Sequence, residues 1–160
     1  MADKKLDGAL ISRVRPGSIA EEADLKPGDR LLSINNEFLS DLIDYKYLIS
    51  DEYLVLSVLK ADGDLWEIEI EKEFDEDLGL EFESATFDTM RQCANRCIFC
   101  FVDQNPPGLR PSLYVYDDDY RLSCLQGNFV TLTNLRREDW DRIGRLHLSP
   151  LYVSVHAMDP

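Results

Sequence analysis

The stretch Val14-Arg-Pro-Gly-Ser-Ile-Ala-Glu-Glu-Ala-Asp-Leu-Lys-Pro-Gly-Asp-Arg-Leu-Leu-Ser-Ile-Asn-Asn36 decides the fold of the first half of the chain. It joins two Pro-Gly turns through a short helix and leads into a strand over Arg30–Asn35. Ser18 can cap the helix that begins at Ile19, because its hydroxyl accepts an otherwise unpaired amide and Glu21 can reach back to the cap. The stretch therefore predicts a small domain of strands and tight turns.

The same pattern of short elements extends from Ala9 to about Glu73. Ala9–Arg15 alternates as a strand, and Ser40–Ile49 predicts a helix because its apolar residues fall at helical spacing. Leu54–Leu59 and Leu65–Ile70 predict a hairpin, since an Asp-Gly turn separates two runs of strand-forming residues. The first half should thus be mostly antiparallel sheet with one main helix.

The opening stretch resembles the signature of PDZ domains, in which a Pro-Gly-Ser turn and a short helix precede Lys-Pro-Gly-Asp and a core strand. The resemblance covers residues 6–74 and implies a small β-sandwich that captures the C-terminus of a peptide or protein by adding a strand to a sheet edge. No Gly-Leu-Gly-Phe carboxylate loop precedes the first strand, and the nearest look-alike, Leu78–Phe82, comes after the last one. A scaffold that only packs against the next domain is the alternative. We place the PDZ-like domain at residues 1–76, ending in the acidic linker Glu71–Asp77.

The pattern of predicted elements changes in residues 77–160, where strands alternate with a helix. Leu80–Phe87, Asn128–Thr133 and Leu151–Val155 predict strands, with a cysteine loop at residues 91–105 after the first of them. A helix is predicted over Glu138–Leu146, with Trp140, Ile143 and Leu146 on its buried side. Strand, helix, strand is the βαβ unit of a parallel sheet. We therefore expect an α/β fold overall.

Three cysteines stand close together in Cys93-Ala-Asn-Arg-Cys97-Ile-Phe-Cys100. The N-terminus carries no apolar signal segment, which predicts a cytoplasmic protein whose thiols stay reduced and are available to hold metal. Three thiolates on one loop would leave one iron of a cubane cluster without a protein ligand. A substrate or cofactor could coordinate that open iron directly.

This motif resembles that of the radical S-adenosylmethionine (SAM) superfamily, including the aromatic residue Phe99 before the third cysteine. With the flanking runs Phe99–Gln104, Asp117–Ser123 and Gly127–Asn134, it is similar to an uncharacterised bacterial radical SAM family that has an N-terminal PDZ-like domain and a C-terminal domain of unknown function. The resemblance implies a [4Fe–4S] cluster and SAM as cofactors, an electron donor such as flavodoxin or ferredoxin, and a (β/α) barrel. Since the chain ends after the third predicted strand, we expect an N-terminal fragment that is inactive alone.

The resemblance also assigns binding residues, but no catalytic residue. It makes Cys93, Cys97 and Cys100 the cluster ligands and Phe99 a packing neighbour of the adenine. The residues Gly127, Asn128, Thr133 and Asn134 lie where the superfamily carries a Gly-Gly-Glu-Pro-like motif that holds the amino group of SAM. Glu and Pro are absent here, so these Thr and Asn residues could instead merely end a strand and cap a helix.

Other interpretations of the cysteines remain open. A structural zinc site could use the same three thiols with Cys124 or His147 as fourth ligand, although a second Cys pair is missing. The thiols could also be inert core residues. In a further alternative, the chain is a peptide-binding or scaffolding module without catalytic activity.

Charge is distributed unevenly between the two halves. The net charge is −14, and residues 1–85 contribute −13 of it through 22 acidic and 9 basic side chains. Such a surface repels phosphate backbones and anionic lipid, so we expect no nucleic acid and no membrane as partner. The longest apolar runs also fall well short of the roughly 20 residues that span a bilayer.

Overall fold

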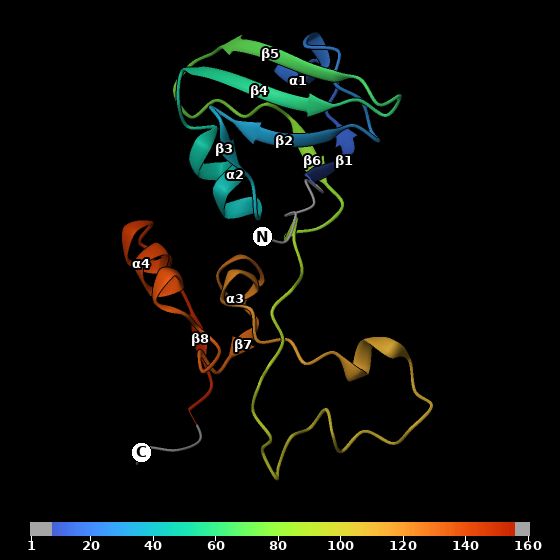
Figure 1. Ribbon diagram of the computed structural model, residues 1–160, viewed down its shortest axis with the longest axis vertical. Helices are drawn as coiled ribbons and strands as arrows, with labels where there is room; N and C mark the ends of the chain where they lie inside the picture. The colour runs from blue at the N-terminus through green and yellow to red at the C-terminus, as the bar shows by residue number, and fades with distance from the viewer. Residues whose placement is uncertain (1–7, 156–160) are drawn as a thin grey trace, which may run out of the picture. The chain divides into compact units, whose positions relative to one another are not determined.

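The computed structural model describes residues 8–155 (Figure 1), and the chain divides between Thr89 and Met90 into two compact units. Each unit has its own sheet. Helices are short in both, and none within residues 8–155 has the length and apolar character needed to cross a membrane. The predicted boundary after residue 76 stays a prediction.

The first unit is built on a six-stranded antiparallel sheet in the order β5-β4-β2-β1-β6, with β3 paired to β2 (Figure 1). The strands are β1 (Ala9–Val14), β2 (Arg30–Ile34), β3 (Glu37–Phe38), β4 (Tyr53–Leu59), β5 (Leu65–Glu71) and β6 (Leu80–Phe82). Two helices, α1 (Ile19–Glu22) and α2 (Leu42–Leu48), connect them. This arrangement confirms the predicted strands of residues 9–70 to within two residues.

Local signals position these elements as the sequence indicates. The Ser18 hydroxyl accepts the backbone N–H of Glu21 at 3.4 Å, and the Glu21 carboxylate accepts the N–H of Gly17 at 2.6 Å. Asp41 caps α2 by accepting the N–H groups of Ile43 and Asp44. Side-chain caps of this kind fix where a short helix begins.

The core of the first unit is apolar and continuous. Strand β4 alternates strictly, so that Leu54, Leu56 and Val58 are fully buried while the residues between them are not. They pack with buried residues of β1, β2, β5 and both helices. Apolar burial of this extent is the main stabilising contribution in a small domain.

The predicted strand Leu80–Phe87 is confirmed only at its start, and its assignment to the barrel is wrong. Only Leu80–Phe82 form a strand, β6, and it pairs antiparallel with β1 at the edge of the first sheet. The local pattern explains this, because Leu80 is buried and Glu81 exposed, as in a strand with one face in water. A strand of a parallel barrel would be buried on both faces.

The second unit contains a short parallel pair of strands. Its elements are a 3₁₀ turn (η1, Pro111–Tyr114), α3 (Tyr120–Gln126), β7 (Phe129–Val130), α4 (Arg137–Arg145) and β8 (Tyr152–Val153). Phe129 pairs with Tyr152 and Val130 with Val153 in parallel register. The predicted strand–helix–strand unit is confirmed, with shorter strands than expected. Within residues 8–155 the pair does not extend into a barrel, so the fold is mixed α/β with mostly antiparallel strands.

Helix α4 does not bury the side chain that the sequence predicts. Trp140 is 51% exposed, whereas Asp139, on the face predicted to be polar, is buried. The reason is an ion pair, since Arg91 donates from both guanidinium nitrogens to the Asp139 carboxylate. The bidentate pair turns this charged side chain inward.

Candidate cluster loop and peptide groove

The three thiols of the cysteine loop are free and partly buried. Cys97 and Cys100 share one turn, in which the N–H of Cys100 donates to the Cys97 carbonyl at 3.0 Å. Cys93 is held separately, through its N–H to the Tyr116 carbonyl at 2.8 Å. Within residues 8–155 no three or more His, Cys, Asp or Glu side chains converge closely enough to hold a metal ion.

The beginning of the loop is fixed against the segment before α3. Gln92 and Asp117 form an antiparallel bridge, and the N–H of Asp118 donates to the Arg91 carbonyl at 3.2 Å. The N–H of Arg91 donates to the Asp119 carboxylate at 3.0 Å. Cys93 therefore starts from a defined backbone position.

A polar cluster at the end of β7 contacts this same point. The Asn95 amide donates to the Thr133 hydroxyl at 2.7 Å, to the Thr131 hydroxyl at 3.2 Å and to the Cys93 sulfur at 3.5 Å. Thr131 in turn donates its N–H and its hydroxyl to Asp118, at 2.5 and 2.7 Å. The structure thus brings Cys93 together with Thr133, which the sequence predicts as a cofactor residue.

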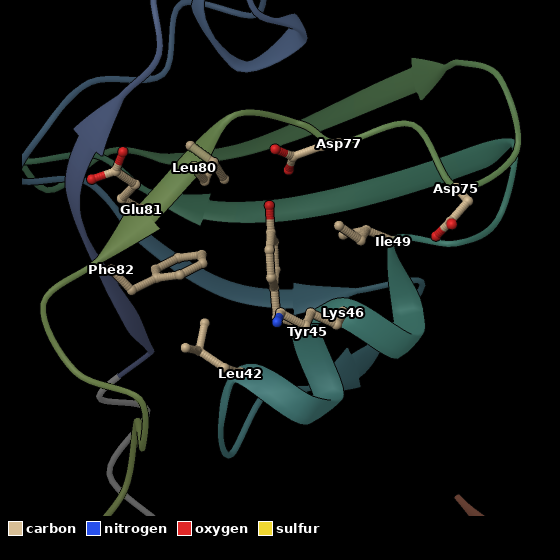
Figure 2. A pocket seen from close by; sticks show the side chains of 9 residues that line it. All are labelled: Leu42, Tyr45, Lys46, Ile49, Asp75, Asp77, Leu80, Glu81 and Phe82. Carbon is tan, nitrogen blue, oxygen red and sulfur yellow. The ribbon is translucent and has the colours of Figure 1, made fainter. Parts of the chain in front are cut away.

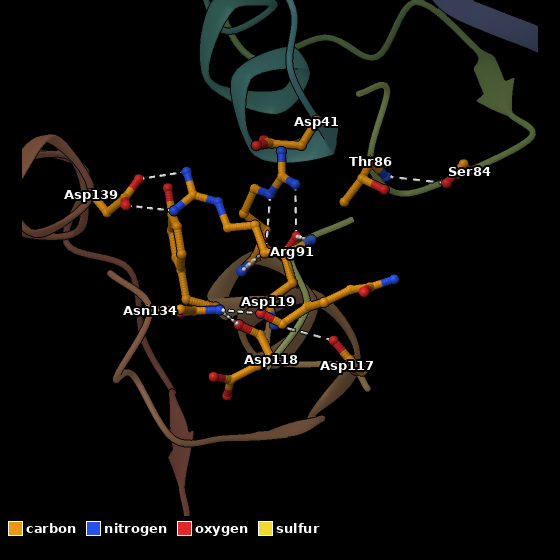
Figure 3. A network of polar contacts seen from close by, with 12 residues as sticks. Asp41, Ser84, Thr86, Arg91, Asp117, Asp118, Asp119, Asn134 and Asp139 are labelled. Carbon is orange, nitrogen blue, oxygen red and sulfur yellow. Dashed lines mark hydrogen bonds and ion pairs between the residues drawn. The ribbon is translucent and has the colours of Figure 1, made fainter. Parts of the chain in front are cut away.

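Asn134 ties β7 to the cysteine loop from a second side (Figure 3). Its amide nitrogen donates to the carbonyls of Gln92 at 3.1 Å and Asp118 at 2.9 Å. Because both partners are acceptors, the orientation of the amide is determined. Its other atom, Oδ1, is buried and makes no hydrogen bond with the described residues. An unpaired buried acceptor is costly and points toward a missing donor.

The other predicted cofactor residues have different surroundings. Gly127 ends α3 in the left-handed conformation, with φ of 81°, and donates its N–H to the Ser123 carbonyl at 3.0 Å. Asn128 donates its amide to Asp117. Phe99 is half exposed. Gly127 and Asn128 therefore shape the turn from α3 into β7.

The sequence does not reveal the buried ion pairs that adjoin the polar cluster at the end of β7 (Figure 3). Arg121 donates to the Asp119 carboxylate at 2.9 and 2.6 Å, and these side chains are 2% and 0% exposed. Burial alone would raise the pKa of Asp119, but hydrogen bonds from Arg121 and from the Arg91 N–H outweigh it and hold that pKa below its usual value. Asp119 also caps α3, a helix that was not predicted from the sequence.

The first unit carries a pocket of about 560 Å³ between α2 and β6 (Figure 2). Its apolar wall is formed by Leu42, Tyr45 and Ile49 from α2 and its C-terminus, together with Leu80 and Phe82 from β6. Asp75, Asp77, Glu81 and Lys46 line the remainder. The look-alike loop Leu78–Phe82, which follows the other strands in sequence, thus lies beside β1 at the edge of the sheet and faces a helix.

Comparison with known proteins finds a family match for each part of the chain. The model of the PDZ domain family matches residues 10–60, and the model of the family described as the Radical SAM-like domain matches residues 72–160. No curated protein matches the sequence. The second match covers more than half of the chain, and the chain therefore belongs to the Radical SAM-like domain family.

Proposed function

We propose that the second unit holds a [4Fe–4S] cluster through Cys93, Cys97 and Cys100 and presents its open iron to SAM. Membership of the Radical SAM-like family supports this proposal. The donor set also supports it, because three free thiols on one loop suit iron–sulfur ligation and leave one coordination site for a second cofactor. We further propose that the protein works in the reducing cytoplasm, where these thiols stay free.

The structure of the loop is compatible with such a site. The sulfurs are not gathered, but Cys93 is anchored while Cys97 and Cys100 lie in an irregular turn. Metal sites of this kind commonly form only as the ion binds, since a preformed site would hold several thiolates together without compensation. To hold a cluster together with Cys93, the turn of Cys97 and Cys100 would have to move toward it.

The observation that carries the SAM part of the proposal is the unpaired Oδ1 of Asn134. An ammonium group is a donor without acceptor capacity, so the amino group of SAM would satisfy this acceptor. Asn95 would orient Cys93 and Thr133 through its donated hydrogen bonds. When a cluster is bound, the chemistry that it supplies is one-electron reduction of SAM, whose sulfonium bond breaks to methionine and a 5′-deoxyadenosyl radical. The electron would come from a donor such as flavodoxin or ferredoxin.

Anaerobic reconstitution with iron and sulfide tests the cluster. The wild-type chain should gain a broad absorption near about 400 nm and bound iron. Cys93→Ala, Cys97→Ala and Cys100→Ala should each lose most of both signals. Cys124→Ala is the matched control, because Cys124 lies on α3 outside the motif, and it should keep them. Equal iron content in all four variants would refute the cluster. Bound zinc in place of iron would refute it as well.

A second measurement separates SAM binding from cluster binding. Asn134→Leu should weaken the binding of SAM to the reconstituted protein while iron content stays at the wild-type level. Thr133→Val is a useful companion, since it removes the hydroxyl that accepts from Asn95. If Asn134→Leu binds SAM as wild type does, the role of Oδ1 is wrong even though the cluster stands.

We also propose a second function, the binding of a peptide in the pocket of the first unit. The PDZ match and the location of the pocket between a sheet-edge strand and a helix support it. In this binding mode an extended peptide adds a strand to a sheet edge. A titration of the whole chain with labelled peptides tests it, and its design depends on the chemistry of the pocket.

A further inference from the structure

The strand at the edge of the pocket has one side free for pairing. β6 is the last strand of its sheet and pairs only with β1 among the described residues. Its other edge faces α2 across the pocket (Figure 2). An exposed strand edge is a template for an added strand, so the backbone of a peptide could extend the sheet here.

The loop that leads into β6 already holds a carboxylate. Asp77 Oδ1 accepts the N–H of Gly79 at 3.2 Å. Gly79 has a φ of +82°, and a Cβ there would lie 2.4 Å from that of Ser18, so the loop can adopt this conformation only with glycine. The C-terminal carboxylate of a peptide would therefore compete with the side chain of Asp77.

Tyr45 provides an unpaired polar atom at the wall of the pocket. Its side chain is 4% exposed, and its hydroxyl makes no hydrogen bond with the described residues. The ring stands edge-on to Phe82 at 4.8 Å, and Figure 2 shows the oxygen directed to the side where Leu80 and Asp77 lie. Burial and the Asp77 carboxylate raise the pKa of this phenol. Arg15 opposes them, as does the nearby backbone of Leu80, although its geometry with the hydroxyl falls short of a hydrogen bond. The hydroxyl stays neutral and can accept a hydrogen bond.

The charge around the pocket favours a cation. Three carboxylates and one lysine line it. Asp77 and Glu81 do meet Arg15 and Arg13, at 2.7 and 3.5 Å, but all four side chains are more than half exposed. Such exposed pairs are weak and exchange readily. The excess of acidic side chains in residues 1–85 adds a long-range attraction for basic partners.

We propose that this pocket binds an internal, extended and basic peptide segment, and that it does not select a free C-terminus. A lysine or arginine side chain of the segment would donate to Asp77 and to the unpaired Tyr45 hydroxyl. The backbone of the segment would pair with the free edge of β6. The proposal rests on the peptide-binding function above and defines its ligand.

Fluorescence anisotropy with the whole chain and three labelled peptides tests the proposal. The first peptide alternates valine and lysine and is capped at both ends, the second replaces lysine by glutamate, and the third is the first with a free C-terminal carboxylate. The capped lysine peptide should bind at least about tenfold more tightly than the glutamate peptide, and more weakly in high salt. The free carboxylate should give no gain in affinity.

Variants connect the binding to the named groups. Asp77→Asn and Tyr45→Phe should each weaken binding of the lysine peptide by about tenfold, because each removes an acceptor for the cation. Glu67→Gln is the matched control, since it removes one exposed carboxylate of β5 outside the pocket, and it should bind as wild type does. Thermal melts establish that each variant is folded.

The outcomes are distinguishable. If the free-carboxylate peptide binds about tenfold more tightly than its capped form, the pocket binds peptides but the internal, basic ligand is wrong. Equal binding of lysine and glutamate peptides overturns the proposal in the same way. If no peptide binds at millimolar concentration, both the peptide-binding function and its proposed ligand fail.

Discussion

The interiors of the two units are stabilised by different kinds of side chain. In the first unit the buried side chains are mostly aliphatic and form one continuous cluster. In the described part of the second unit the buried hydrophobic side chains are only Val102, Tyr120 and Val130. Its buried residues also include the charged Asp118, Asp119, Arg121 and Asp139, and Arg121 is the largest fully buried side chain among the described residues. One sequence thus combines an apolar core with a polar one.

The difference is informative about how each unit serves its site. Apolar packing tolerates substitutions that conserve volume, and its close-packed side chains give the pocket of the first unit a firm wall. A buried ion pair instead depends on each partner, because the desolvation of a charge is offset only while its hydrogen bonds persist. In the second unit the buried Asp119 carboxylate also accepts the N–H of Arg91, and the Arg91 carbonyl accepts the N–H of Asp118. These bonds position the beginning of the cysteine loop.

Removing one buried carboxylate should be the most damaging change. Asp119→Asn removes one charged partner of the buried Arg121 and weakens the cap of α3. We expect the free energy of unfolding of the second unit to fall by about 3–5 kcal/mol. Each unit contains one tryptophan, so urea titration of the Trp66→Phe background follows the second unit through Trp140.

The matched control for this prediction is Asp141→Asn, which changes an exposed aspartate of α4. It should stay within about 0.5 kcal/mol of wild type. If Asp119→Asn has as small an effect, the second unit does not depend on its buried ion pair and the comparison fails.

Truncating an apolar side chain should have the next largest effect, and in the first unit. Leu56→Ala removes a fully buried side chain from the centre of β4. We expect a loss of about 2–4 kcal/mol, because both transfer free energy and a cavity contribute. Urea titration of the Trp140→Phe background reports on the first unit through Trp66. A transition that shifts equally in the Trp66→Phe background would show that the units unfold together.

Much of the first unit could be predicted because its signals are local. The Ser18 cap, the Asp-Gly hairpin turn and the alternation of β4 are each read within a few residues. The strand at Leu80 could be predicted, but its pairing could not, since its partner β1 lies more than sixty residues away in sequence. Only the tertiary pairing decides that Leu80–Phe82 belongs to the first sheet.

In the candidate sites, too, local features could be predicted from the sequence and long-range contacts could not. The spacing of the three cysteines is local, and so the sequence indicates a cluster loop. The contact of Asn95 with Thr133 and the pair of Arg91 with Asp139 join residues about forty or more positions apart, and no periodicity reveals them. Burial of Asp139 also contradicts the rule that charged helix positions face water, because its partner approaches from another segment.

Acid should affect the polar unit more than the apolar one. Burial opposes ionisation of Asp29, Asp119 and Asp139, but their hydrogen bonds to Lys60, Arg121 and Arg91 dominate and lower all three pKa values. A lowered folded-state pKa gives stability that is present above the unfolded value of about 3.9 and is lost as pH falls through the folded pKa. Two of these buried aspartates lie in the second unit and one in the first. Lys26 also lowers the pKa of Asp24 in the first unit, but that ion pair is exposed and contributes little to stability. The urea midpoint followed by Trp140 should therefore fall more steeply from pH 5 to pH 2 than that followed by Trp66.

The smallest effects should come from a Tyr-to-Phe substitution made once in each unit. The change in the free energy of unfolding should have opposite signs in the two units. Tyr120→Phe removes a hydroxyl that accepts from Arg142 at 2.9 Å, so the second unit should lose about 1.5 kcal/mol. Tyr45→Phe removes a buried hydroxyl without a hydrogen bond among the described residues, so the first unit should gain up to about 1 kcal/mol. Urea titration with the two tryptophan backgrounds measures both. A loss at Tyr45 would mean that its hydroxyl is already satisfied, which would also remove the reason for a cationic ligand to reach it.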